Sequence, residues 1–392
     1  MPVRRSKVLL VKWIFENQHK LQTVRWCSSS LRYKELEESA QALEHVAPHA
    51  AAAAPDVKPR PYRAPETSFK HDDLQVTLAA PYQLQRKPDA PDLGFGKYFT
   101  DHMLKIQYHK QLGGWQKPEI TPFEPLSIHP AAKALHYAIQ LFEGLKAYRG
   151  VDDKIRLFRP DLNMRRMNLA AERSGLPMFD GDELIKCIKR LIQIDQEWVP
   201  HSETSTLYIR PTLIGTEATF GIMAPESALL FVILSPVSAY YKASDDGAVS
   251  IYADPSVVRA FPGGVGNRKV GSNYGPTIEK QLSTPPLNGL ILPGVTRQSI
   301  LELASEWDDL TVKEEVITMD RVIELNNSGR LLEMFGSGTA VVISPISRMG
   351  FIDQEIYIPT MKQTRPVFQR IKDTLLAIQY GHIEHPYSHV IS

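Results

Sequence analysis

A lysine and a tyrosine lie five residues apart in a glycine-rich stretch, Phe261–Thr277, with the sequence FPGGVGNRKVGSNYGPT. Glycine can adopt positive φ and lets the backbone approach a ligand closely. Lys269 lies among four of these glycines, and Tyr274 follows it. Such a lysine can hold a phosphate as a point charge, or act as a nucleophile and base once it loses its proton. Which of these two roles applies decides the chemistry of the chain.

The stretch does not match the common nucleotide-binding motifs. A P-loop needs Ser or Thr after its lysine, but Val270 follows Lys269, and GxGxxG fails because Lys269 takes the place of a glycine. The chain also has no HExxH, no CxxC and only scattered histidines, so we predict no metal site. The GxSxG motif of a serine nucleophile is absent, and the sequence Gly336-Ser337-Gly338 matches it only in part.

Composition limits the class of protein. A chain of 392 residues with 43% hydrophobic and 23% charged residues is typical of a globular protein of two domains with extensions. A net charge of +1 argues against a nucleic-acid partner. The longest apolar runs, such as Ala228–Leu234, are too short to span a membrane. Two cysteines, Cys27 and Cys187, give no disulfide framework, and we expect Cys187 to be buried.

The N-terminal region has the composition of a targeting sequence followed by a linker. Residues 1–34 contain eight Lys/Arg, a single acid and the run Ser28–Ser30, which predicts a mitochondrial transit peptide and a matrix protein; the alternative is a solvated basic tail. Residues 35–92 contain Ala50–Ala54 and many prolines, so we predict a flexible linker or arm without a packed core. We then expect a small domain over 93–240, a linker over 241–248 and a large domain over 249–392.

Two helices and two strands are predicted in the small domain. A helix over LNMRRMNLAAERSG ends at Gly175, and Asp180 with Glu183 forms a capping box for the next helix. That second helix presents an apolar face of Leu184, Cys187, Ile188 and Leu191. The strand Thr206–Gly215 carries Tyr208 and Arg210 on one face, because side chains repeat every two residues. An apolar strand over Ala228–Leu234 ends at Pro236.

The second half alternates between strands and helices. We expect a strand at Val249–Ala253, helices at Gly294–Trp307 and Asp320–Leu325, a strand–turn–strand over LLEMFGSGTAVVISPI and a helix at Phe368–Tyr380. Such an order indicates a mixed α/β or α+β fold.

Pyridoxal phosphate is a cofactor whose requirements this chain can meet in part. It needs a lysine, a phosphate site, a donor to its phenolic oxygen and a carboxylate at its ring nitrogen. Lys269 and Tyr274 could supply the first and the third. The helix start at Gly294–Thr296 and the turn Gly338-Thr339 both offer N–H groups to a phosphate. Taken alone, each of these turns is also an ordinary loop.

Eight blocks of sequence together resemble the branched-chain aminotransferases of the fold-type IV pyridoxal-phosphate group. They are Phe95-Gly-Lys, FTDHM, LHYAIQLFEGLKAY, LFRPDLNMRRM, LYIRPTLIG, GNRKVGSNYGPT, PPLNGLILPGVTRQS and EMFGSGTA, and they occur in family order over most of residues 93–382. The resemblance implies a small α/β domain, a larger barrel-like domain and pyridoxal 5'-phosphate as cofactor. It further implies transfer of an amino group from Leu, Ile or Val to 2-oxoglutarate by a homodimer.

The resemblance also implies a role for each matching residue. Lys269 would link to the cofactor and carry the proton, and Tyr274 would donate to the phenolate oxygen. The phosphate would be held by Arg166, Val295, Thr296 and Thr339. The N–H groups of Thr339 and Ala340 would bind the substrate carboxylate. The side-chain pocket would be lined by Phe95, Phe142, Tyr208 and, across a dimer interface, Tyr137. Arg210 would bind the second carboxylate of glutamate or 2-oxoglutarate, and the loop Gly215–Met223 would close over the neighbouring subunit's site.

The chain departs from the family pattern at two places. Val341–Ser344 occupy the positions of a CxxC in vertebrate members, so we expect no thiol redox switch. Only Ile278–Thr284 separate NYGPT from PPLNG, where the family has about forty more residues, including the acid at the ring nitrogen. Glu279 is the only acid in this junction, and nothing assigns it that role. An omitted exon is our hypothesis for the shortened large domain.

Three other functions stay open at this point. The shortened junction would suit a catalytically impaired isoform that acts as a dimer partner or cofactor binder. A second possibility is another fold-type IV enzyme, such as a D-amino acid aminotransferase or a lyase. The third is a phosphate-binding protein in which Lys269 only contacts phosphate.

Overall fold

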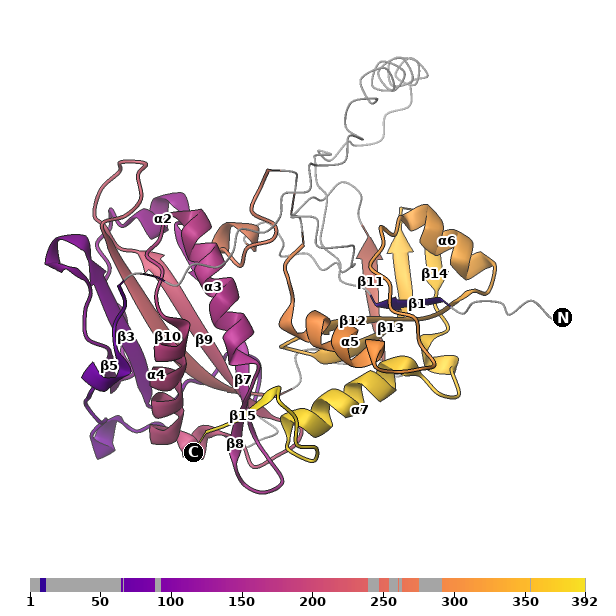
Figure 1. The fold of residues 1–392 in the computed structure, drawn as a ribbon, viewed down its shortest axis with the longest axis horizontal. Coiled ribbons are helices and arrows are strands. Elements are labelled where there is room, and N and C mark those ends of the chain that lie inside the picture. Colours follow the sequence, from indigo (N-terminus) through magenta and orange to yellow (C-terminus); the bar gives the residue numbers. More distant parts are fainter. Residues whose placement is uncertain are drawn as a thin grey trace, which may run out of the picture. The chain divides into compact units, whose positions relative to one another are not determined.

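The computed structural model describes residues 8–11, 65, 67–88, 93–238, 247–253, 260, 263–274, 291–352 and 354–391, with the backbone alone for 8–11. Strands and helices alternate along the chain, and the described strands form two sheets (Figure 1). The mixed α/β prediction is therefore confirmed. Both strand orders are open paths, so the barrel-like closure expected for the larger domain is not seen in this part of the chain.

The first sheet has ten strands in the order β15-β8-β7-β9-β10-β3-β5-β2, with β4 on β3 and β6 on β9. All its pairs are antiparallel except β2 with β5. Its strands are β2 (Gln75–Val76), β3 (His102–His109), β4 (Gly114–Trp115), β5 (Glu119–Pro122), β6 (Gln140–Phe142), β7 (Leu145–Arg149), β8 (Ile155–Phe158), β9 (Thr206–Gly215), β10 (Ser227–Val237) and β15 (Ser388–Val390).

The strand predicted at Ala228–Leu234 is longer than expected. β10 continues through Pro236, which lies opposite Leu207 of β9. Proline has no N–H to donate, but β3 pairs with β10 only as far as Val232. The strand can therefore hold Pro236 where its second neighbour has ended, and the predicted break at this residue is wrong.

Two helices, α3 (Pro160–Ser174) and α4 (Gly181–Ile194), pack against each other, and α4 also packs on β3 (Figure 1). The end predicted for α3 is confirmed, since Gly175 has φ 67°. The Asp180 side chain accepts from the N–H groups of Asp182 and Glu183, as an N-cap should. The reciprocal half of the predicted capping box is wrong. Asp180 N–H donates to Ser68, and Glu183 accepts from His71 N–H instead.

The segment before β3 contributes to the core, contrary to the expectation for residues 35–92. Phe69 is 3% exposed and contacts the rings of Trp115 and Phe179, with centroids 5.4 and 6.0 Å away. The composition of residues 35–92 did not indicate that Phe69 is buried, because prolines dominate the stretch before it.

The second sheet has the order β1-β12-β13-β11, with β14 on β13. Its strands are β1 (Val8–Val11), β11 (Val249–Ala253), β12 (Leu331–Gly338), β13 (Val342–Phe351) and β14 (Gln354–Tyr357). β12 and β13 form the predicted hairpin, and β1 pairs in parallel with β12. The remaining α-helices of the described residues are α2 (Lys133–Tyr137), α5 (Val295–Ser305), α6 (Met319–Asn327) and α7 (Val367–Gln379).

A buried apolar cluster joins elements of both sheets. It contains Tyr148 of β7 and Phe158 of β8 together with Phe335 of β12, Ile300 of α5 and Leu375 of α7. Burial of side chains this large is the main stabilising contribution available to a fold. The cluster therefore fixes β7 beside the start of α5 and the β12–β13 turn.

Candidate functional site

Lys269 and Tyr274 meet as their spacing suggested. Lys269 Nζ donates to Tyr274 Oη at 3.2 Å, and both side chains are half-buried. The glycine-rich stretch docks along β6, where Phe142 N–H donates to the Lys269 carbonyl at 3.1 Å. A Cβ at Gly271 would lie 2.7 Å from Gln140 Nε2, so a larger residue there would force the Gln140 side chain to move. The backbone therefore brings Lys269 to the end of β6.

An aromatic wall surrounds the lysine. The Phe142 ring centroid lies 4.6 Å from Lys269 Nζ and 4.9 Å from the Tyr274 ring. The guanidinium of Arg210 lies 4.8 Å from the same Phe142 ring and donates to Tyr208 Oη at 3.2 Å. This contact confirms that Arg210 and Tyr208 share one face of β9.

Phe95 extends this wall, since its ring lies 4.9 Å from the Tyr208 ring. Three predicted pocket residues, Phe95, Phe142 and Tyr208, are thus joined by the structure. Rings around a lysine make a surface that suits an apolar side chain.

Arg166, expected at the phosphate, is held by a carboxylate. Its Nε and one terminal nitrogen donate to the two oxygens of Glu143 at 2.6 and 2.7 Å, and its other terminal nitrogen donates to the Pro293 carbonyl at 3.1 Å. Burial opposes the charged form, but the facing Glu143 outweighs it and raises the pKa of Arg166. A guanidinium has five N–H groups, so one on each terminal nitrogen has no partner among the described residues. The bond to Pro293 places this guanidinium next to Gly294, the N-cap of α5.

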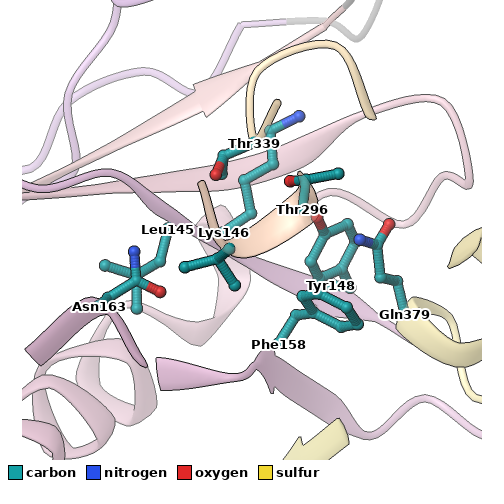
Figure 2. Close-up of a pocket in the computed structure, with 9 residues that line it drawn as sticks. Leu145, Lys146, Tyr148, Phe158, Asn163, Thr296, Thr339 and Gln379 are labelled. Carbon is teal, nitrogen blue, oxygen red and sulfur yellow. The ribbon is translucent and has the colours of Figure 1, made fainter. Parts of the chain in front are cut away.

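The other phosphate candidates line one small cavity, shown in Figure 2. Val295 and Thr296 come from the first turn of α5, whose N-cap is Gly294, and Thr339 comes from the β12–β13 turn. The cavity is completed by Leu145, Lys146, Tyr148, Phe158, Asn163 and Gln379. N–H groups at a helix start and threonine hydroxyls are suitable donors for a phosphate.

Lys146 reaches this turn from β7. It is 6% exposed, and its Nζ donates to the Ala340 carbonyl at 3.0 Å. Burial lowers the pKa of Lys146 to about 8. Ala340, expected at the substrate carboxylate, is thereby tied to β7, which begins three residues after Phe142 at the end of β6.

Tyr137 is placed apart from these contacts. From the end of α2, its hydroxyl donates to the carbonyl of Phe220 in the loop Gly215–Met223 at 2.6 Å. The buried Lys133 holds the same loop through Glu217 Oε2 at 2.8 Å and the Met223 carbonyl at 3.0 Å. The side chains of Phe220, Ile222 and Met223 are 66%, 84% and 77% exposed. The loop is ordered at its base and presents apolar side chains outward.

Sequence reasoning missed Glu143 and Lys146. Both are charged residues within the block LFEGLKAY, and both are buried at 0% and 6% exposed. Two charged residues in an apolar strand segment are the signal that could have found them, since unpaired charges are rarely buried.

The residues Phe142–Lys146 contact four of the predicted site residues. Phe142 contacts Lys269 and Arg210, Glu143 binds Arg166, and Lys146 binds Ala340. Across these contacts, four cations face one carboxylate. Arg210 Nε is also buried without a hydrogen-bond partner among the described residues. A surplus of cations, of which Arg166 and Lys146 are buried and Lys269 and Arg210 half-buried, fits a dianionic phosphate together with a substrate carboxylate.

Other predicted features lie elsewhere. Ile278–Thr284, Glu279 within it, Cys27 and the linker 241–248, apart from Gly247 and Ala248, lie outside the described residues. Cys187 is fully buried in α4, and burial raises the pKa of its thiol to about 12, as an inert structural cysteine requires. Where the structure is described, no group of three or more His, Cys, Asp or Glu is placed to hold a metal ion, and no helix is long and apolar enough to cross a membrane.

Comparison with known proteins gives consistent matches. Residues 270–349 match the family model described as amino-transferase class IV. The cytosolic branched-chain-amino-acid aminotransferase of Mus musculus is 48% identical over 358 residues, covering 81% of this chain and 92% of that protein. The mitochondrial enzyme of Bos taurus is 43% identical over 365 residues, covering 82% and 92%.

Solved structures share the fold. The branched-chain aminotransferase from Thermoproteus uzoniensis with norvaline gives a TM-score of 0.56 at 19% identity, covering 70% of this chain and 97% of that one. The branched-chain amino acid aminotransferase from Thermobaculum terrenum in its PLP-bound holo form gives a TM-score of 0.55 at 17% identity, covering 74% and 98%.

The alignment with the mouse protein has a gap of the expected size. It runs over 358 positions, whereas 81% of 392 residues is about 318, so about 40 aligned positions have no residue in this chain. This number equals the size of the shortfall predicted after Thr277.

Proposed function

Because the chain belongs to the branched-chain-amino-acid aminotransferase family, we propose that it transfers the amino group of leucine, isoleucine or valine to 2-oxoglutarate with pyridoxal 5'-phosphate as cofactor. The observation that carries this proposal is the placement of Lys269 Nζ, 3.2 Å from Tyr274 Oη and 4.6 Å from the Phe142 ring centroid. The surplus of cations around Phe142–Lys146 supports two anionic groups beside this lysine.

Each of the chain's own site residues would have a separate role in binding or proton transfer. Arg166 and the α5 start would bind the phosphate, and Tyr274 would donate to the phenolic oxygen. When bound, the cofactor accepts the electron pair left on the substrate Cα as that carbon loses its proton. Lys269 Nζ would take this proton, because an amine held near an aromatic wall and a hydroxyl can act as a general base. Thr339 and Ala340 N–H groups would orient the α-carboxylate.

Activity with purified protein tests the function directly. Leucine and 2-oxoglutarate should yield glutamate and the branched 2-oxo acid in equal amounts. Production of D-glutamate from D-alanine and 2-oxoglutarate would support a D-amino acid aminotransferase instead. Release of pyruvate without an amino acceptor would support a lyase. No turnover with intact cofactor binding would favour the impaired isoform that the short junction suggested.

Arg210 is proposed to distinguish the two substrates. Its guanidinium lies over the Phe142 ring. A second carboxylate in this pocket would accept its N–H groups, whereas a leucine side chain has no acceptor to offer. We expect Arg210→Met to raise KM for 2-oxoglutarate about tenfold or more, the cost of a charged hydrogen bond, and to change KM for leucine far less. Arg190→Met, at an exposed position on α4, is the matched control. An equal rise for both substrates would contradict this role.

We propose a homodimer in which the loop Gly215–Met223 and Tyr137 cover the partner's site. The support is the exposure of Phe220, Ile222 and Met223 on a loop whose base is fixed by Lys133. An exposed apolar group of this kind is typical of an interface. Sedimentation equilibrium should give twice the chain mass, and Ile222→Asp should weaken the dimer; a monomer in the active wild type would contradict the proposal.

We propose the mitochondrial matrix as the compartment, supported by the basic, acid-poor residues 1–34. Relatives carry both cytosolic and mitochondrial names. Cleavage of residues 1–34 would remove β1 from the edge of β12. Residues 1–34 fused to a fluorescent protein should direct it to mitochondria, and a diffuse cytosolic signal would contradict the proposal.

A further inference from the structure

Lys146 is a buried cation without a counter-charge among the described residues. Its Nζ meets one acceptor there, the Ala340 carbonyl at 3.0 Å. An ammonium has three N–H groups, and a buried group that lacks partners lowers the free energy of unfolding. In Figure 2 the side chain extends from β7 toward Thr339. A neutral apolar residue would fill this position at a lower cost in stability.

The turn that Lys146 meets has a second unfavourable feature. Val341 N–H closes it by donating to the Gly338 carbonyl at 3.1 Å. The next residue, Val342, has φ 57°, a left-handed conformation that β-branched residues rarely adopt. Strained backbone persists where the surrounding structure holds it, and it often accompanies a functional site. The buried ammonium and the strained backbone both lower stability at this turn, which indicates that its conformation serves a function.

We propose that Lys146 is a positioning residue that fixes the β12–β13 turn through the Ala340 carbonyl, so that the N–H groups of Thr339 and Ala340 stay directed at the substrate carboxylate. The carbonyl and the N–H of Ala340 flank one Cα, so holding the oxygen limits rotation of the neighbouring peptide planes. Lys146 itself does not touch substrate in this arrangement. The inference rests on the proposed function, because it assigns a support to that carboxylate site.

Binding of a substrate-like carboxylate measures the effect without turnover. The probe is 4-methylvaleric acid, a branched carboxylate without an amino group, titrated into the protein loaded with pyridoxal phosphate. For Lys146→Met, we expect Kd of the probe to rise about tenfold, the value of one well-placed hydrogen bond, and Kd of pyridoxal phosphate to change much less. KM for leucine should rise more than kcat falls. Lys146→Arg keeps a charged donor and should restore most of the affinity.

Thermal unfolding separates this role from a merely structural one. Tm of cofactor-free Lys146→Met should equal or exceed that of the wild type, since a buried charge is replaced by an apolar side chain of similar length. Lys154→Met, at an exposed lysine in the turn between β7 and β8, is the control and should leave both Kd and Tm unchanged.

Three results would overturn the proposal. A lower Tm with unchanged probe affinity would assign Lys146 to stability alone. Weaker binding of pyridoxal phosphate with unchanged probe affinity would place it at the phosphate. Unchanged Kd, KM and Tm would leave it without a role. A wild type that fails to bind pyridoxal phosphate would instead refute the proposed function, so the two failures are distinguishable.

Discussion

Replacing Lys269 by alanine is expected to lower kcat for leucine about 10³-fold or more, because the variant loses both the nucleophilic amine and the base. The distance of 3.2 Å to Tyr274 Oη and the half-buried setting make Lys269 the only amine that the described contacts place against the Phe142 ring. Cofactor binding should survive in weakened, non-covalent form, since Arg166, Thr296 and Thr339 remain. Single-turnover kinetics with leucine measure the loss.

Lys154→Ala is the matched control, because this lysine is exposed and its removal changes the same charge. Added methylamine should restore part of the Lys269→Ala activity by supplying a diffusible amine. A variant that keeps even a tenth of the wild-type kcat would contradict the assigned role.

Glu143→Gln has the largest expected effect on stability. The substitution keeps the shape of the side chain but leaves Arg166 as a buried cation without its carboxylate. Loss of one partner of a buried ion pair costs about 3–5 kcal/mol in the free energy of unfolding. Urea unfolding of the cofactor-free protein at pH 7 measures it.

Two further variants make the comparison specific. Glu226→Gln removes a carboxylate from an exposed pair with Lys110, and we expect a much smaller loss of stability, because solvent screens this pair. Glu143→Gln combined with Arg166→Met removes both charges and should recover much of the stability. Equal losses for the Glu143 and Glu226 variants would show that the buried pair contributes no more than a surface one.

Local patterns predicted local structure well. The apolar spacing of Leu184 and Cys187 predicted the buried face of α4, and alternation predicted β9 with Tyr208 and Arg210 together. The spacing of Lys269 and Tyr274 was informative because a five-residue separation in a tight, glycine-rich turn leaves few arrangements open. Such features depend on neighbours along the chain.

Features that depend on distant partners could not be predicted in the same way. Phe69 is buried because Trp115 and Phe179 cover it, and nothing in its proline-rich surroundings indicates these rings. Pro236 stays in β10 because β3 has already ended beside it. Glu143 and Lys146 matter through Arg166 and Ala340, which are 23 and 194 residues away. The family resemblance implied a role for each site residue, but only the fold showed which contacts position these residues.

Reduction with borohydride tests most directly whether Lys269 carries out the proposed transfer. The purified chain is saturated with pyridoxal phosphate, reduced and digested, and the labelled peptide is identified by mass spectrometry. We expect the label on Lys269, and we expect prior addition of leucine without acceptor to prevent it by converting the cofactor to its amine form. Label on another lysine, or no label, would contradict the site; label on Lys269 that persists after leucine would contradict the transfer of the amino group.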